Sequence, residues 1–144
     1  VIAHLIWPRG TEVALRPRLA GLRHKLSGGS LVLAVGAGVA VVTGFLLTWI
    51  NLAVGIIGNE NNPANQIFFG VLLVAMFGAV LSRLRPLRLA RAMEVTAVAQ
   101  FAAAVVTFFL EQAHVWVLTA VFAGMWLLSA QLFHKAARDQ AGAG

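Results

Sequence analysis

Residues 31–57, LVLAVGAGVAVVTGFLLTWINLAVGII, decide the fold because no side chain among them is charged. A helix needs about 20 apolar residues to cross a hydrocarbon layer roughly 30 Å thick, so this stretch is long enough to span a membrane. Further apolar stretches follow, and the whole chain is 60% hydrophobic and 11% charged. This is far more apolar than a soluble domain needs to build one core. The chain is therefore expected to be a membrane protein.

The apolar stretches predict four crossings. Backbone groups in lipid must be paired within the spanning structure, and long runs without strand alternation favour helices over a barrel. The apolar region between residues 92 and 133 is too long for one crossing, so the chain is expected to reverse near EQAH (111–114). The predicted spans are residues 31–57, 64–82, 90–110 and 115–133. The predicted fold is all-α: a four-helix transmembrane bundle over residues 31–134, a cytoplasmic-side N-terminal amphipathic segment over 1–30, and a short cytoplasmic tail over 135–144.

All 11 basic residues fall on one side of this arrangement. Cytoplasmic loops of membrane proteins carry an excess of Lys and Arg, which predicts that the N and C termini are cytoplasmic. The same rule accounts for the net charge of +6 without nucleic acid as a partner. Arg outnumbers Lys, and Ala, Gly and Val are abundant, so a bacterial inner membrane is the expected location. The basic residues assigned to the membrane surface are Arg16, Arg18, Arg23, Lys25, Arg83, Arg85, Arg88 and Arg91.

The N-terminal segment contains EVALRPRLAGLRHKL (12–26), in which leucines recur at helical spacing among basic residues. This pattern predicts an amphipathic helix that lies on the inner leaflet. Two alternatives fit the same residues. One is an arm docked on a partner subunit, and the other is a partly disordered tail that carries the topology charges.

The first outer turn, IIGNENNPANQIFF (56–69), concentrates polar residues between two apolar segments. Asn62 is a good helix N-cap, and Pro63 suits the first helical position, where its missing N–H costs nothing. A capped turn is the favoured interpretation. The alternative is that Glu60 and the neighbouring carboxamides bind a cation, a lipid headgroup or a partner loop.

The second outer turn places Glu111 three residues before His114. The Glu-x-x-His pattern occurs in di-metal sites inside four-helix bundles, but here it appears once. Together with Glu60 it would form a minimal three-ligand site for Zn, Mn or Fe. A solvated turn is favoured, so no metal or other cofactor is predicted. The chain has no cysteine, and no nucleophile–base set or phosphate loop is visible, so no catalytic residue and no enzyme activity are predicted.

Polar side chains inside the spans are expected to face other helices. Thr96, Gln100 and Thr107 recur at helical spacing in the third span, and Gln100 lies near mid-bilayer, where an unpaired carboxamide is costly. Gln100 is therefore expected to bond across the bundle, as is Asn51 in the outer half. Packing is the favoured role of this stripe, and a path for an ion or small solute is the alternative. Glu94 is expected to pair with the nearby Arg91.

Two tryptophans and two sets of small residues complete the pattern. Trp49 and Trp116 fall near the outer ends of their spans, where indoles anchor helices at the interface. Small residues spaced four apart let helices approach closely. They occur in the first span and the fourth, at Gly36, Ala40, Gly44, Ala120 and Gly124.

Three stretches resemble bacterial four-span integral membrane proteins that are known only as hypothetical proteins. They are WINLAVGIIGNENNPANQIFFGVL (49–72), SRLRPLRLAR (82–91) and WLLSAQLFHKAAR (126–138). The first stretch is fairly specific, whereas the other two mostly reflect topology. The resemblance implies a four-span membrane protein and implies no activity.

The leading functional prediction is a structural or accessory interaction subunit of a larger membrane complex. Its expected partners are membrane lipids, including bound lipid, and other membrane subunits. The alternative is a small-solute or ion transporter or channel subunit that works as a homo-oligomer. Four-span multidrug exporters, however, rely on a carboxylate in the first span, and residues 31–57 contain none. A metal-dependent enzyme on the outer face is the third possibility.

Overall fold

The computed structural model describes residues 28–58, 61–111 and 115–142, without the side chains of residues 110 and 111. Most of the expected amphipathic segment, including Arg16, Arg18, Arg23 and Lys25, lies outside these residues.

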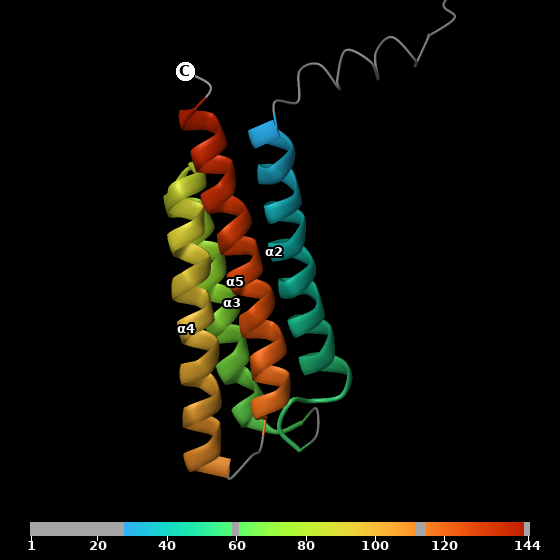
Figure 1. Ribbon diagram of the computed structural model, residues 1–144. Helices are drawn as coiled ribbons and strands as arrows, with labels where there is room; N and C mark the ends of the chain where they lie inside the picture. Colours follow the sequence, from blue (N-terminus) through green and yellow to red (C-terminus); the bar gives the residue numbers. More distant parts are fainter. Residues whose placement is uncertain (1–27, 59–60, 112–114, 143–144) are drawn as a thin grey trace, which may run out of the picture.

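The described chain folds into four long helices (Figure 1). Helix α2 spans Gly28–Ala53, and α3 spans Gln66–Ser82 after a single 3-10 turn, η2, at Pro63–Asn65. Helices α4 and α5 span Pro86–Glu111 and Trp116–Ala141. All four are long and apolar enough to cross a membrane. The all-α, four-helix fold is confirmed, and the protein is a multi-pass membrane protein.

The helices differ in length from the predicted spans. Helix α2 ends at Ala53, so residues 54–57 belong to the following turn. Helix α4 begins at Pro86 because proline is preorganised for the first helical position. Helix α5 continues to Ala141, so most of the expected tail at 135–144 is helical. Hydropathy marks only the apolar part of a helix, whereas the helix itself continues into the polar surroundings.

Helix α5 is central to the bundle. It packs against α2 on one side and α4 on the other, and α4 packs against α3. Helices α2 and α3 are consecutive in the chain but scarcely touch. In Figure 1 the start of α2, the α3–α4 turn and the end of α5 lie at one end of the molecule. We call this the basic end, because it carries Arg83, Arg85, Arg88, Arg91, Lys135 and Arg138.

Small residues create the closest helix contacts. At Gly36 of α2, a Cβ atom would lie 3.1 Å from the Phe133 ring of α5. The Ser129 hydroxyl of α5 donates a hydrogen bond of 2.9 Å to the Gly36 carbonyl oxygen. At Gly78 of α3, a Cβ atom would lie only 2.8 Å from the Cβ of Ala92 in α4. These two glycines therefore allow the α2–α5 and α3–α4 backbones to approach.

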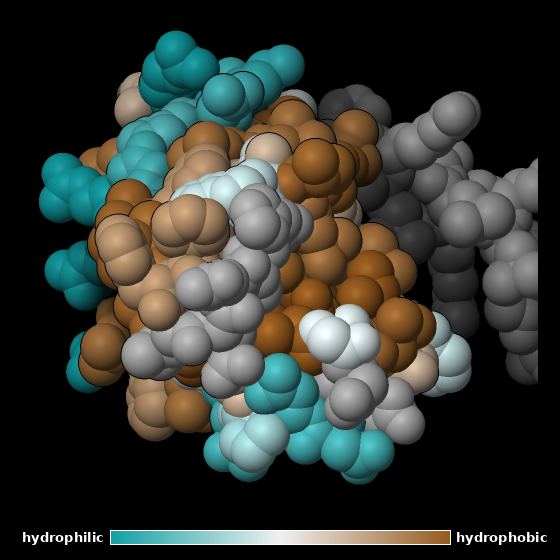
Figure 2. All heavy atoms as spheres, turned by 90° about the horizontal axis from the view of Figure 1, so that it is seen from below, coloured by the Kyte–Doolittle hydropathy of each residue, from teal (hydrophilic) through white to brown (hydrophobic). Residues whose placement is uncertain are grey.

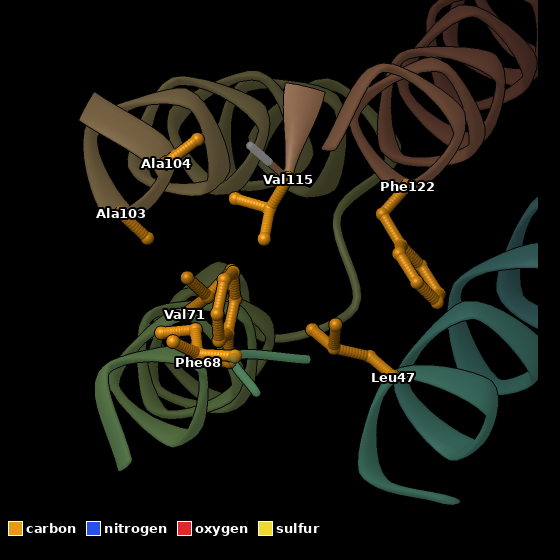
Figure 3. Packing of buried hydrophobic residues seen from close by; sticks show 8 residues of the cluster. Leu47, Phe68, Val71, Ala103, Ala104, Val115 and Phe122 are labelled. Carbon is orange, nitrogen blue, oxygen red and sulfur yellow. The ribbon is translucent and has the colours of Figure 1, made fainter. Parts of the chain in front are cut away.

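Two buried apolar clusters fill the bundle. The cluster far from the basic end joins all four helices (Figure 3) and includes Leu47, Phe68, Val71, Ala103, Ala104, Val115 and Phe122. The second cluster, nearer the basic end, includes Ala75, Leu89, Ala90, Met93, Ala97, Trp126, Ala130 and Phe133. Much of the outer surface is also apolar, and Figure 2, a view onto the end opposite to the basic end, shows hydrophobic residues between hydrophilic patches. Large side chains such as Val80 and Val117 are mostly exposed, as lipid-facing residues of a spanning helix are.

Candidate functional site

The turn between α2 and α3 is built by its asparagines. The Asn62 side chain accepts a hydrogen bond of 2.9 Å from the Ala64 N–H and caps η2, with Pro63 at the first helical position. The buried Asn65 side chain accepts a bond of 2.8 Å from the Ile57 N–H. Asn51 was expected to bond across the bundle; it donates a hydrogen bond of 3.0 Å to the Asn65 carbonyl oxygen and so links α2 to the turn. These asparagines therefore act as structural residues of the turn.

The three candidate metal ligands lie at or beyond the limits of the described residues. Glu60 and His114 lie outside the described residues, and Glu111 is the last residue of α4 with its side chain not described. Among the residues that are described, no group of three His, Asp or Glu side chains could hold a metal ion. The metal site stays a sequence-based alternative.

The polar stripe of α4 lies in the interior. Thr96, Gln100 and Thr107 are all buried. The Thr96 hydroxyl donates to the Ala92 carbonyl oxygen at 2.8 Å, and the Thr107 hydroxyl donates to that of Ala104 at 3.0 Å. Both hydroxyls are thus satisfied within their own helix.

Gln100 differs from the prediction. Its side chain is 1% exposed, yet its Oε1 atom has no hydrogen-bond partner, so the expected bond across the bundle is absent there. Asn51 Oδ1, Thr119 Oγ1 and Trp126 Nε1 are also buried without partners. The interior therefore holds unpaired polar atoms on α2, α4 and α5.

Glu94 does not pair with Arg91, contrary to expectation. Its Oε1 atom lies 2.8 Å from His134 Nε2, and this contact joins α4 to α5. It is the single contact between a basic and an acidic side chain found among the described residues. The prediction was wrong because it considered only neighbours of Glu94 on its own helix, whereas the packing of α5 on α4 brings His134 to Glu94.

The two tryptophan anchors lie at the end opposite to the basic end. Trp49 near the end of α2 is 61% exposed and stacks on Phe45 with ring centroids 6.1 Å apart. Trp116 begins α5 and is 41% exposed, and its ring centroid lies 5.6 Å from that of Phe108. Exposed indoles at a helix end suit the membrane interface.

The small residues of the fourth span do not act as predicted within this chain. Ala120 and Gly124 are exposed, and a Cβ atom on Gly124 would meet no atom within 4 Å. Of the two predicted sets, only the set on α2 lies at a helix contact or beside a groove. Periodicity alone does not show which face of an apolar helix meets a neighbour.

A groove runs between α2 and α3, with a cavity volume of about 370 Å³. It exists because the two helices scarcely touch, so α4 and α5 form its floor. The lining is apolar, and the one hydroxyl in it, Thr48, donates to the Gly44 carbonyl oxygen at 2.8 Å. The α2–α3 groove is lined by Ala40, Val41, Gly44, Phe45, Thr48, Leu72, Ala75, Met76, Ala79, Met93 and Trp126. Of these residues, only Ala40 and Gly44 belong to the small-residue pattern predicted from the sequence.

A search of protein-family models, curated proteins and solved structures found no match to this chain. The resemblance drawn from the sequence therefore stays an expectation, and function has to be argued from the geometry.

Proposed function

We propose that this protein is a structural or accessory subunit that binds a transmembrane helix of a partner subunit in the α2–α3 groove. The observation that carries the proposal is the sparse contact between α2 and α3, which leaves an apolar groove of about 370 Å³. The proposal assigns the protein no catalytic step and no cofactor.

The lining supports a helix as the occupant. Ala40 and Gly44 on α2 face Ala75 and Ala79 on α3, and small residues let the backbone of another helix approach closely. Met76 lies at the exposed edge, where its flexible thioether can adapt to a partner. Of the polar groups in the lining residues, the Thr48 hydroxyl is bonded within α2, and the Trp126 Nε1 atom is buried without a partner.

Site-specific photo-crosslinking in native membranes tests this proposal. A photoreactive amino acid at Met76, which lines the groove, is expected to give a discrete adduct with a protein that co-purifies stoichiometrically in mild detergent. The matched control is Val80, which is exposed on the same helix but outside the groove. Val80 is expected to give no such adduct.

Other outcomes point elsewhere. Adducts only with a second copy of this chain would favour the homo-oligomeric alternative. Equal labelling from Met76 and Val80, or no protein adduct from either, would contradict the proposal. Gly44→Leu fills the groove and is expected to reduce the adduct, whereas Gly38→Leu, at an open position of α2, is expected to leave it unchanged.

We also propose that the membrane is a bacterial inner membrane and that the basic end faces the cytoplasm. The support is the clustering of Lys and Arg at that end, as the positive-inside rule requires. Because the chain has no cysteine, single cysteines at Asn61 and Arg85 give an unambiguous test. They are expected to react with an impermeant thiol reagent from opposite sides, and labelling of both from outside would refute the orientation.

The transporter alternative has one observation in its favour, the unpaired polar atoms in the interior. Gln100 Oε1 and Thr119 Oγ1 are buried in different helices, and both lack partners. The hydroxyls of Thr96 and Thr107 weaken this alternative because they are bonded to their own helix. A solute flux in proteoliposomes that is lost in Gln100→Leu would favour the transporter.

A further inference from the structure

A second hollow, of about 320 Å³, lies between α3 and α4 at the basic end. Its walls include Val74 and Gly78 from α3 and Val95 from α4. Arg88 and Arg91 form its polar part. It lies between a different helix pair from the α2–α3 groove, so the inference drawn from it does not depend on the proposed function.

The hollow follows from the close approach of α3 and α4. Gly78 and Ala92 meet so closely that a Cβ on Gly78 would lie 2.8 Å from the Cβ of Ala92. Small side chains at this contact leave a depression between the larger side chains on either side. The bottom of the hollow is therefore formed by short, apolar side chains.

The two arginines lie on one face of α4, because residues three apart are neighbours on a helix surface. Both are exposed, and neither pairs with a carboxylate among the described residues. The nearby Glu94 is bonded to His134 on the α5 side. Two unneutralised guanidinium groups at this spacing suit a phosphate group, which can accept several charge-assisted hydrogen bonds.

The polar and apolar parts of the hollow are separated along the membrane normal. Val95 lies four residues beyond Arg91, about 6 Å deeper along α4. The Ser82 hydroxyl is buried and donates to the Ala79 carbonyl oxygen at 2.6 Å, so it is not free to bind a ligand. A ligand that fits must carry a negative charge at the membrane surface and an apolar chain below it.

A larger hollow between α4 and α5, of about 620 Å³, suits an anion less well. It is lined by His134 and Arg138, but the Glu94 carboxylate is bonded to His134. That carboxylate would repel a phosphate. The α3–α4 hollow has arginines without such a neighbour in the described part of the chain.

We propose that the α3–α4 hollow is a binding site for one anionic phospholipid, whose phosphate is held by Arg88 and Arg91 and whose acyl chain lies against Gly78 and Val95. Basic pockets between transmembrane helices recognise anionic headgroups in this way. The site takes a lipid of the surrounding membrane and not free phosphate, because most of its lining is apolar.

Native mass spectrometry of the delipidated protein in detergent tests the headgroup contact. Phosphatidylglycerol is expected to bind more tightly than phosphatidylcholine of the same chain length. In Arg88→Gln/Arg91→Gln this binding is expected to weaken about tenfold or more, because charge-assisted hydrogen bonds are lost. Arg83→Gln/Arg85→Gln removes the same charge at the same end outside the hollow and is expected to retain the binding.

Equal weakening in both double variants would overturn the proposal, because it would indicate general attraction to the basic end.

A second pair of variants tests the contact with the acyl chain. Val95→Trp fills the hollow, whereas Val98→Trp adds the same side chain at an exposed position outside it; the two valines are 59% and 69% exposed. Phosphatidylglycerol binding is expected to fall only in Val95→Trp. Glycerol phosphate without chains that binds as tightly as the lipid would also contradict the proposal.

Discussion

The replacement of Gly36 by leucine gives the sharpest test of how α2 is held on α5. A Cβ at this position would lie 3.1 Å from Phe133 Cε1 and 3.2 Å from Leu132 Cβ. The rest of a leucine side chain has no room unless α2 moves away from α5. Movement would also lengthen the 2.9 Å hydrogen bond from the Ser129 hydroxyl to the Gly36 carbonyl oxygen.

The cost can be estimated from these contacts. Overpacking costs about 1–3 kcal/mol. Loss of an intramembrane hydrogen bond adds roughly 0.6 kcal/mol on average and up to about 2 kcal/mol. Leucine is a better helix former than glycine by up to about 1 kcal/mol, and this gain has to be removed from the comparison. Gly38→Leu supplies that control, because Gly38 is exposed on the same helix and has no atom near its Cβ position.

Unfolding of both variants in detergent, monitored by circular dichroism, measures the difference between their unfolding free energies. We expect Gly36→Leu to be less stable than Gly38→Leu by about 2–5 kcal/mol. Ser129→Ala should be destabilising in the wild-type background and have a smaller effect in Gly36→Leu, where the hydrogen bond is already lost. Equal stability of the two leucine variants would refute the α2–α5 packing.

Three further predictions concern other contacts. Gly78→Ala should lose about 1–3 kcal/mol in unfolding free energy through its clash with Ala92, and Ala92→Gly should restore much of it; an additive loss would contradict the contact. Asn65→Ala leaves the buried Ile57 N–H unpaired and should cost about 1–3 kcal/mol, so an unchanged thermal midpoint would argue against this turn. Gln100→Leu removes an unpaired buried oxygen and should be neutral or stabilising; a large loss of stability would reveal a partner for the amide.

The sequence alone was sufficient for the features that depend on local chemistry. Four apolar runs, each long enough to cross a bilayer, predicted four helices. Outside a closed barrel, only a helix can pair all backbone N–H and C=O groups of a segment in lipid. Asn62 and Pro63 predicted the start of the second span, because a cap and a proline act through neighbouring backbone atoms. The clustering of Arg and Lys predicted which helix ends share a side.

The tertiary structure decided which faces of the helices meet. In a soluble helix the polar face marks the side away from the core, but lipid is as apolar as the core, so this signal is weak here. Gly36 is therefore buried against α5 while Gly124 faces outward, although both belong to similar small-residue patterns. Glu94 found His134 instead of Arg91 because two antiparallel helices brought residues from distant parts of the chain together. The α2–α3 groove also results from tertiary packing, because α2 packs on α5 and not on α3, the next helix in the chain. This choice depends on how small and large side chains fit across the helices.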